Sequence, residues 1–247
     1  MRIFVLGAGA TGSLIAHLLV RQGHHVTCGD RDPVRARRFL GRKSAIPIRQ
    51  ANARNLRSIV RAARGSHLLV NASPAVFNRT VLRAALRLRA HYLDTASHQT
   101  SNPFKAEQVG FDRQFQAKNR SAVINAGLAP GLTNLLVARG VLYRARFAAA
   151  VVARGQKNGR HAVIRWDAGF PTLRDMRRRE VHASPISWAT AHLAALFVKH
   201  FPRGSPGVHP PEALPAQTRQ AILAGARAYG MRIGMRLTLL KTVDDEE

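Results

Sequence analysis

Three glycines near the start of the chain have the spacing of a phosphate-binding turn. Residues 7–12 read GAGATG, so Gly7, Gly9 and Gly12 form a G-x-G-x-x-G pattern. The first glycine permits a tight turn, the second lets the backbone approach a pyrophosphate, and the third lets a helix lie close to the preceding strand. Backbone N–H groups and the helix dipole then face the phosphate charge. The pattern predicts a dinucleotide-binding turn made by Gly7, Ala8, Gly9, Ala10, Thr11 and Gly12.

An acid follows this turn at the distance that suits a ribose contact. Asp30 lies 18 residues after Gly12, directly behind a short apolar segment at 25–29. A carboxylate in this position accepts hydrogen bonds from the adenosine ribose hydroxyls of NAD. It would repel the 2′-phosphate of NADP, whereas Arg31 could bind that phosphate, with Arg35 one helical turn further on. The expected cofactor is therefore NAD(P), with a slight lean towards NAD.

Short apolar segments alternate with amphipathic segments around these residues. Residues 2–6 are too short for a helix and rich in strand formers, and apolar side chains then recur at helical spacing from Leu14 to Leu19. Further strands are expected at 25–29, 45–49, 67–71, 91–94 and 122–125. Helices are expected at 33–40, 55–63, 104–118 and 132–140, with one more ending near residue 89. Strands that alternate with helices pair in parallel, so residues 1–140 are predicted to form a Rossmann-type, doubly wound α/β domain.

A different pattern begins near residue 147. Strand-like segments at 148–153 and 162–166 flank Asn158-Gly159, a dipeptide typical of a hairpin turn. A helix is expected at 188–200, a loop at 201–215, a helix at 216–228 and an extended segment at 231–240. Residues 141–247 are therefore predicted to form a smaller α+β region with antiparallel strands, suited to substrate binding or dimerisation. Its C-terminal helix could pack back on the first domain.

The chain is strongly basic, with 39 Lys and Arg residues against 13 Asp and Glu and a formal net charge of +26. This excess alone would suggest a nucleic-acid binder. No nucleic-acid-binding motif is visible, and aromatic residues make up only 6% of the chain, which leaves few side chains to stack on bases. Four arginines from Arg54 to Arg64 fall at spacings of three, four and three, the pattern of a solvated helix face. The charge is interpreted as mostly surface, and nucleic acid is not an expected partner.

Other features limit the class of protein. Cys28 is the single cysteine, which excludes a disulfide framework and a cysteine-based metal cluster. The 11 histidines have no metal-like spacing. No apolar run approaches the roughly 20 residues that span a bilayer, and the N-terminal MRIFVLGAG lacks the features of a signal peptide. We therefore expect a cytoplasmic protein without a bound metal or a membrane partner.

Two further segments complete the pattern. The first is Asn71-Ala72-Ser73-Pro74, which is followed one predicted helix later by HYLDT at residues 91–95. The second is GLAPGLTN at residues 127–134. Together with the Gly-rich turn and Asp30, these segments resemble the saccharopine dehydrogenase-like family of NAD(P)-dependent oxidoreductases, over about residues 1–140.

The resemblance implies hydride transfer at amino-acid-type C–N bonds, as in saccharopine and lysine, or related polyamine chemistry. A small amino-acid or imine substrate is then expected, and a homodimer is one assembly to consider. The cofactor's sugar and nicotinamide half would lie beside Asn71, Ala72, Ser73 and Pro74. The substrate and nicotinamide side would include Thr95, Gly127, Pro130, Gly131 and Asn134.

Asp94 is the candidate catalytic residue. It is one of only three acids in the first 100 residues, and it ends a predicted strand where open α/β sheets bind ligands. The side chain could orient a substrate amine or the nicotinamide ribose, or accept a proton. It could equally cap the loop after its strand, and the sequence leaves both roles open.

The chain departs from the family pattern between residue 134 and the helix at 216–228, where family members usually have a longer substrate domain. Two alternative functions are therefore considered. The first is an NAD(P)-dependent dehydrogenase or reductase. The second is a non-catalytic dinucleotide-binding or regulatory protein with a basic, polyanion-binding surface.

Overall fold

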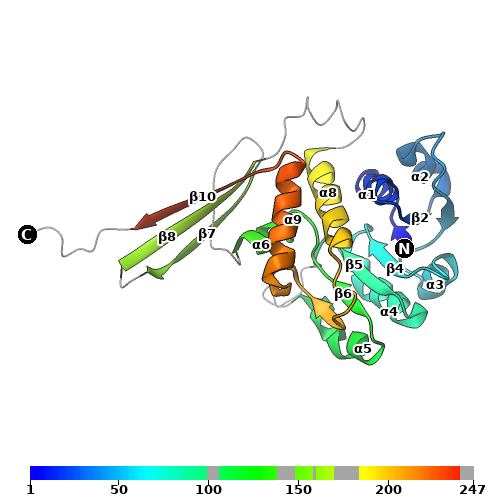
Figure 1. Ribbon diagram of the computed structural model, residues 1–247. Coiled ribbons are helices and arrows are strands. Elements are labelled where there is room, and N and C mark those ends of the chain that lie inside the picture. Colours follow the sequence, from blue (N-terminus) through cyan, green and yellow to red (C-terminus); the bar gives the residue numbers. More distant parts are fainter. Residues whose placement is uncertain (99–105, 138–147, 158–159, 170–183, 240–247) are drawn as a thin grey trace, which may run out of the picture.

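The computed structural model describes residues 1–98, 106–137, 148–157, 160–169 and 184–239. These residues form a large parallel sheet with helices on both faces and a smaller antiparallel sheet (Figure 1). The strands of the large sheet, in spatial order, are β3 (Ile48–Gln50), β2 (His25–Asp30), β1 (Arg2–Leu6), β4 (Leu68–Asn71), β5 (His91–Asp94), β6 (Ser121–Val123) and β9 (Gly207–His209). The predicted doubly wound α/β fold is confirmed.

Both faces of the large sheet are covered because its central strands are apolar on both sides. In β1, Ile3 and Val5 join one hydrophobic core, whereas Phe4 and Leu6 join the other, as the alternation of side chains along a strand requires. The helices of the first face are α1 (Ala10–Arg21), α2 (Pro33–Leu40) and α8 (Pro185–Lys199). The helices of the second face are α3 (Leu56–Ala62), α4 (Asn78–Leu88) and α5 (Asp112–Ala117).

The helices of this fold begin in two ways. The side chain of Asp32 accepts a hydrogen bond of 2.9 Å from the backbone N–H of Arg35, so Asp32 is the N-cap of α2. Asn55 caps α3 in the same manner, with a bond of 3.1 Å from Ser58. Helix α1 differs, because its N-cap is Gly9 and no side chain caps it. Its first N–H groups are therefore available to a ligand.

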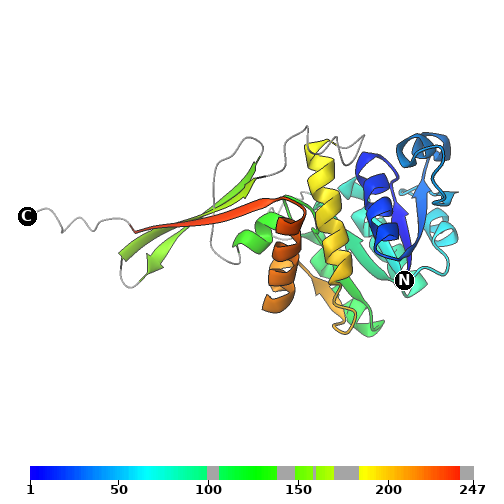
Figure 2. The same ribbon diagram turned by 45° about the horizontal axis from the view of Figure 1, so that its top comes forward.

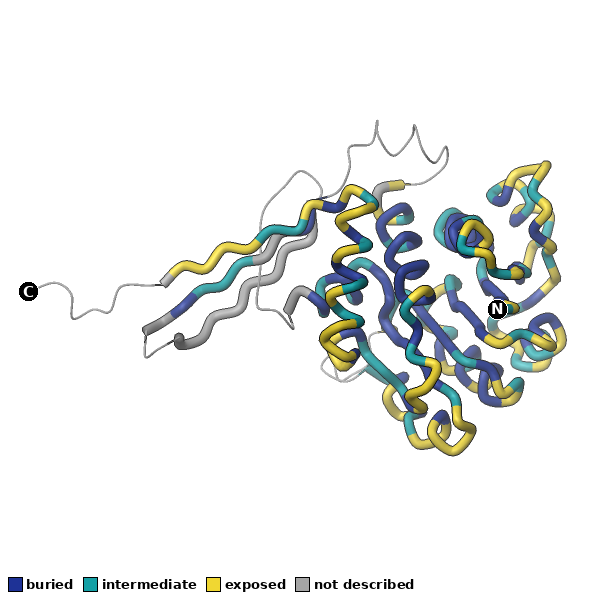
Figure 3. The backbone as a smooth tube through the Cα atoms, in the orientation of Figure 1, coloured by how far each residue is buried: buried dark blue, intermediate teal, exposed yellow. Residues whose placement is uncertain are grey.

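The smaller sheet extends away from the parallel sheet (Figures 1 and 2). It contains β7 (Ala148–Lys157), β8 (Arg160–Gly169) and β10 (Arg232–Leu239), with β8 in the centre and both pairings antiparallel. The predicted hairpin strands are confirmed, while the Asn158-Gly159 turn lies outside the described residues. Much of β10 is exposed (Figure 3).

The C-terminal part of the chain also contributes to the layers of the parallel sheet. Helix α8 packs between α1 and α9 (Ala216–Ala228), and α9 leads into β10 (Figure 1). Strand β9 pairs in parallel with β6 at the sheet edge. The division into domains at residue 140 stays a prediction. Within the described ranges, no helix combines the length and apolar character that crossing a membrane would need.

One sequence prediction of secondary structure is wrong, and another is confirmed only in part. The predicted loop at 201–215 contains β9, which is held in place by a distant side chain: Asp112 accepts a 2.8 Å hydrogen bond from the backbone N–H of Val208. The predicted helix at 104–118 is confirmed in its second half by α5, whereas Glu107–Phe111 forms a 3₁₀ helix and residues 104–105 lie outside the described part of the chain. The formation of β9 thus depends on contacts between segments far apart in the sequence.

Candidate dinucleotide-binding site

The Gly-rich turn connects the end of β1 to the start of α1, and two of its glycines are sterically required. Gly7 has a φ of +92°, and a Cβ there would lie 2.7 Å from the backbone nitrogen of Ser73. A Cβ on Gly12 would overlap the carbonyl oxygen of Gly7. A Cβ on Gly9 would meet no atom within 4 Å, so this position faces open space. The turn therefore packs tightly against the protein at Gly7 and Gly12 and stays open at Gly9, where a pyrophosphate would approach.

Asp30, at the end of β2, holds this turn in place. One carboxylate oxygen accepts a 2.9 Å hydrogen bond from the backbone N–H of Ala8, and the other accepts a 3.0 Å bond from the N–H of Asp32. The two oxygens thereby bind the Gly-rich turn and the start of the next helix. Part of the negative charge of Asp30 is balanced by these donors before any cofactor arrives.

A cavity of about 440 Å³ opens beside the turn and Asp30. It lies at the carboxyl ends of β1 and β4, where the strand order reverses, which is the usual ligand position in open α/β sheets. The predicted cofactor residues that line it are Gly7, Ala8, Gly9, Asp30, Arg31, Ala72, Ser73 and Pro74. The predicted residues that do not line it are Ala10, Thr11, Gly12 and Asn71.

Three arginines line the same cavity. The sequence alone indicates only two of them, Arg31 and Arg35, as possible ligands of a 2′-phosphate. The third, Arg54, is assigned by its spacing to a solvated helix face, but α3 begins two residues later, at Leu56. Arg54 therefore belongs to the turn before the helix, where its guanidinium carbon lies 5.7 Å from the ring centroid of Phe77. Arg35 lies over the ring of Phe39 at 5.8 Å. Both aromatic rings also line the cavity, and no sequence signal marks them.

Asn71 does not line the cavity but holds the turn beside it in place. Its side-chain oxygen accepts a 3.1 Å hydrogen bond from the backbone N–H of Ser73, which fixes the Ala72–Pro74 turn. Its amide nitrogen donates to the side-chain oxygen of Asn78 at 2.8 Å, and Asn78 in turn donates to the carbonyl of Ala96. Asn71 is buried, so it positions the turn rather than lining the cavity.

Asp94 is 1% exposed and does not line the cavity, and its carboxylate lies among hydrogen-bond donors. Its carboxylate accepts a 2.7 Å bond from the backbone N–H of Asn125 and a 3.2 Å bond from the side chain of Gln108. Burial raises the pKa of Asp94 to about 6, although the hydrogen bonds from Asn125, Tyr92 and Gln108 oppose this increase. These contacts tie the end of β5 to the segment after β6, as a loop cap would, and the catalytic role stays a prediction.

The remaining predicted residues form a second turn. Gly127 and Gly131 form a β-bridge, Pro130 follows a cis peptide bond, and the side chain of Asn134 accepts a 3.0 Å bond from the N–H of Gly131. A Cβ on Gly127 would overlap the carbonyl oxygen of Thr95. The structure thus brings the turn at 127–134 against Thr95, which follows β5. The contact of these residues with nicotinamide or substrate stays a prediction.

A doubly wound parallel sheet with an open Gly-rich turn and a cavity at its switch point defines a Rossmann-type dinucleotide-binding protein. Residues 3–127 match the model of the saccharopine dehydrogenase NADP binding domain, and the chain belongs to this family. It therefore contains the NADP-binding domain of an oxidoreductase family.

Individual proteins are similar over part of their length. The chain is 24% identical over 166 residues to the carboxynorspermidine synthase of Vibrio cholerae serotype O1, which covers 58% of this chain and 40% of that protein. Apo saccharopine dehydrogenase (L-Glu forming) from Saccharomyces cerevisiae is 15% identical, with a TM-score of 0.47 over 56% of this chain and 30% of the yeast chain. An NADPH-dependent quinone oxidoreductase from Escherichia coli is 20% identical, with a TM-score of 0.40 over 62% of this chain and 58% of that chain. The chain thus spans less than half the length of the first two proteins.

The lean towards NAD is not supported, because the matching family model describes an NADP-binding domain. The geometry provides a physical reason. The repulsion expected from Asp30 is weakened by its two backbone donors, and Arg31, Arg35 and Arg54 line the same cavity. Three guanidinium groups near one carboxylate leave a net positive charge, which suits an additional phosphate.

Proposed function

We propose that the protein is an NADPH-dependent oxidoreductase that transfers hydride at an amino-acid-type C–N bond. The observation that carries the choice of cofactor is the convergence of Arg31, Arg35 and Arg54 on the cavity that contains the Gly-rich turn. When bound, NADPH would supply the hydride. The protein would hold the pyrophosphate at the open turn around Gly9 and bind the 2′-phosphate with the arginines.

The choice of substrate follows from the names of the similar proteins. The name of the Vibrio cholerae relative points to a carboxylated polyamine, and saccharopine dehydrogenase is named for an amino-acid derivative. In the direction of reduction, an imine would take up hydride from NADPH and one proton to give an amine and NADP⁺. The expected substrate is therefore a small imine or amino acid with a carboxylate. A second copy of the chain is a further partner that we propose, since β10 leaves Met235 67% exposed.

Cofactor choice is tested by fluorescence titration of NADPH and NADH. The double variant Arg31→Gln/Arg35→Gln should lower the affinity for NADPH by about 100-fold, because each charged hydrogen bond is worth roughly tenfold or more. It should change NADH binding by less than about threefold, since NADH lacks the 2′-phosphate. Arg83→Gln, an exposed arginine on α4, is the matched control. Equal losses for both cofactors would contradict the assignment of the arginines.

Turnover is tested separately, by following NADPH absorbance with carboxylate-bearing imines formed from keto acids and amines. Oxidation of NADPH that depends on the imine would support the enzyme. Cofactor binding without turnover across a panel of such substrates would favour the alternative, a non-catalytic dinucleotide-binding or regulatory protein.

A further inference from the structure

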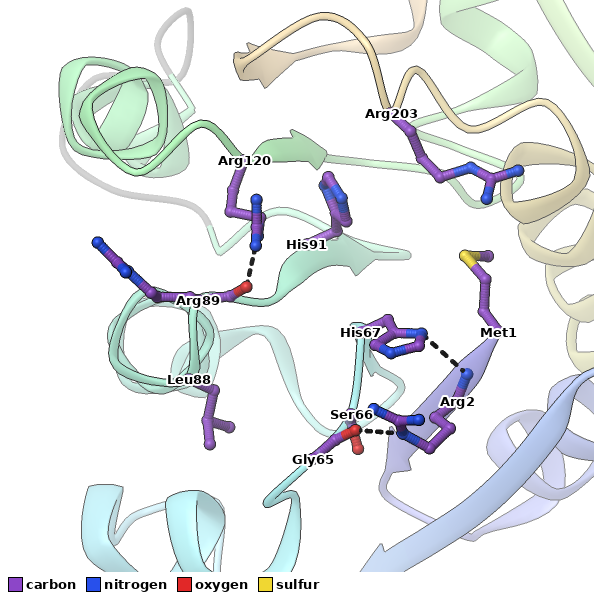
Figure 4. A pocket seen from close by; sticks show the side chains of 10 residues that line it. All are labelled: Met1, Arg2, Gly65, Ser66, His67, Leu88, Arg89, His91, Arg120 and Arg203. Carbon is purple, nitrogen blue, oxygen red and sulfur yellow. Dashed lines mark hydrogen bonds between the residues drawn. The ribbon is translucent and has the colours of Figure 1, made fainter.

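A second cavity, also of about 440 Å³, lies at the opposite end of the large sheet (Figure 4). It is lined by residues at or just before the amino ends of four strands: Arg2 for β1, His67 for β4, His91 for β5 and Arg120 for β6. The dinucleotide cavity lies at the carboxyl ends of the same sheet. In a parallel sheet these two ends are on opposite edges, so the second cavity is separate from the cofactor site.

This cavity gathers positive charge. Its ten lining residues include four arginines, Arg2, Arg89, Arg120 and Arg203, together with two histidines, and no aspartate or glutamate. The pKa of His67 is lowered by burial and by Arg2, and that of His91 by burial and by Arg120. Like charges brought together without a counter-charge repel one another, and a bound anion would relieve this repulsion.

Two of the arginines are held in place by backbone carbonyl groups. The Nε of Arg2 donates to the carbonyl of Gly65 at 2.7 Å. The Nε of Arg120 donates to the carbonyl of Arg89, which is the left-handed residue at the end of α4. Each guanidinium keeps further N–H donors, and Figure 4 shows both groups at the cavity with their bonds dashed. Donors that are already oriented bind an anion with less loss of conformational entropy.

Arg203 provides a donor group from another part of the chain. It follows α8, and its guanidinium forms no hydrogen bond with any described residue. Figure 4 shows its side chain above Met1, on the opposite side of the view from Arg89 and Arg120. The arginines therefore line the cavity from three segments, near residues 2, 120 and 203, that are far apart in the sequence.

These features match a phosphate chain more closely than a single ion. Guanidinium groups pair well with phosphate oxygens, and several separated arginines can bind successive phosphates. A neighbouring cavity of about 390 Å³ shares Arg2 and continues the basic lining with Arg49 and Arg64. The lining of the cavity that holds Arg120 and Arg203 includes no Phe, Tyr or Trp on which a base could stack.

We propose that the amino-terminal edge of the sheet binds an oligophosphate, a chain of two or more phosphate groups, at a site separate from the dinucleotide cavity. The site is formed by Arg2, Arg120 and Arg203, with His67 and His91 between them. It does not depend on the proposed oxidoreductase activity. Because a longer chain would reach more of the arginines, affinity should rise from phosphate to pyrophosphate to tripolyphosphate.

Isothermal titration of the full chain with tripolyphosphate tests the proposal. Arg120→Gln/Arg203→Gln should weaken binding by about 100-fold, at roughly tenfold for each lost charged contact. The cofactor-cavity variant Arg31→Gln/Arg35→Gln and the surface control Arg57→Gln/Arg83→Gln should stay within about threefold of the wild type. Binding that survives Arg120→Gln/Arg203→Gln, or that is lost only in the cofactor-cavity variant, would overturn the proposal.

A second variant guards against misfolding, because Arg120 also contacts the end of α4. Arg203→Gln removes no hydrogen bond to the described protein, so it should keep the melting temperature and still weaken tripolyphosphate binding by about tenfold. A competition experiment separates the phosphate chain from a nucleic acid. A single-stranded oligonucleotide that displaces tripolyphosphate from the wild type, and that binds more tightly than tripolyphosphate and loses this affinity in Arg203→Gln, would identify a nucleic-acid site and overturn the proposal.

Discussion

The ionised form of Asp94 should destabilise the folded protein at neutral and alkaline pH. Its carboxyl group is fully buried, and burial raises its pKa from the ordinary value of 3.8 to about 6 despite the donors around it. Each tenfold change in proton affinity corresponds to about 1.4 kcal/mol, so the difference corresponds to about 3 kcal/mol. We therefore predict that Asp94→Asn increases the free energy of unfolding at pH 8 by up to about 3 kcal/mol.

The neighbours of Asp94 can accommodate an amide in place of the carboxylate. The side-chain oxygen of Gln108 is buried and has no hydrogen-bond partner among the described residues. If the Gln108 amide turns over, this oxygen can accept a hydrogen bond from the amide nitrogen that the substitution introduces. The oxygen that the substituted side chain retains can still accept from the backbone N–H of Asn125, as the carboxylate does now at 2.7 Å. Asp94→Asn therefore removes a buried charge and gives the introduced amide nitrogen an acceptor, while the amide nitrogen of Gln108 moves to the position of an oxygen that has no partner among the described residues. This cost makes about 3 kcal/mol the upper bound of the gain.

The effect of pH has a definite sign. Above about pH 6 the carboxyl group is ionised in both the folded and the unfolded chain, and the wild type carries the full cost of the buried charge. As the pH falls from 6 towards 3.8, the folded protein takes up a proton that the unfolded chain does not, so the stability of the wild type rises relative to the variant. The advantage of Asp94→Asn should therefore disappear near pH 4.

Urea unfolding of the wild type and Asp94→Asn between pH 4 and 8, followed by circular dichroism, measures this difference. Asp32→Asn is the matched control, because asparagine also caps a helix well and should change stability by less than about 0.5 kcal/mol at every pH. A stability difference that does not vary with pH, or a variant that is less stable at pH 8, would refute the reasoning. The same variant separates the two roles of Asp94: a loop cap predicts unchanged kcat, whereas a proton acceptor predicts a large loss.

Three further predictions concern the packing of the site. Gly12→Ala should reduce NADPH binding at least tenfold and destabilise the fold by more than about 2 kcal/mol, because its Cβ would overlap the carbonyl of Gly7; normal melting and binding curves would contradict this. Cys28 is buried, and burial raises the pKa of its thiol to about 12. Its reaction with a disulfide reagent should therefore proceed at the rate of unfolding, and fast labelling of the native protein would contradict this. Asn71→Ala should cost about 1–3 kcal/mol in urea unfolding, since it leaves the buried oxygen of Asn78 without its 2.8 Å partner; a loss below about 0.5 kcal/mol would argue against that role.

The dinucleotide half of the fold could be predicted because its signals are local. An apolar strand, a Gly-rich turn and a helix follow one another within residues 2–21. Asp30, whose carboxylate binds the turn, lies only nine residues further on. The hairpin of β7 and β8 could be predicted for the same reason. Strand β9 could not, because its three residues become a strand only by pairing with Ser121–Val123, which a loop-like composition rich in proline and glycine does not indicate.

The parts of the site that sequence reasoning misses also depend on distant segments. Helical spacing alone assigns Arg54 to a solvated face, yet Asn55 caps α3 and leaves Arg54 in the preceding turn, beside the cavity. Phe39 and Phe77 reach the cavity from elements on opposite faces of the sheet. The hydrogen bonds of Asp30 to Ala8 and Asp32 need tertiary geometry, and they explain why an acid at this position does not decide the choice of cofactor.

The same topological reasoning applies to the basic cavity. Residues that follow parallel strands meet at one edge of a sheet, which is why the ends of β1, β2 and β4 indicate the cofactor site. Residues that begin or precede parallel strands must meet at the other edge, and here Arg2, His67, His91 and Arg120 occupy those positions. Helical periodicity does not detect such a group, because its members are spaced by whole strand–helix units. The proposed oligophosphate site thus gives part of the +26 charge a specific role that neither composition nor helix-face patterns indicate.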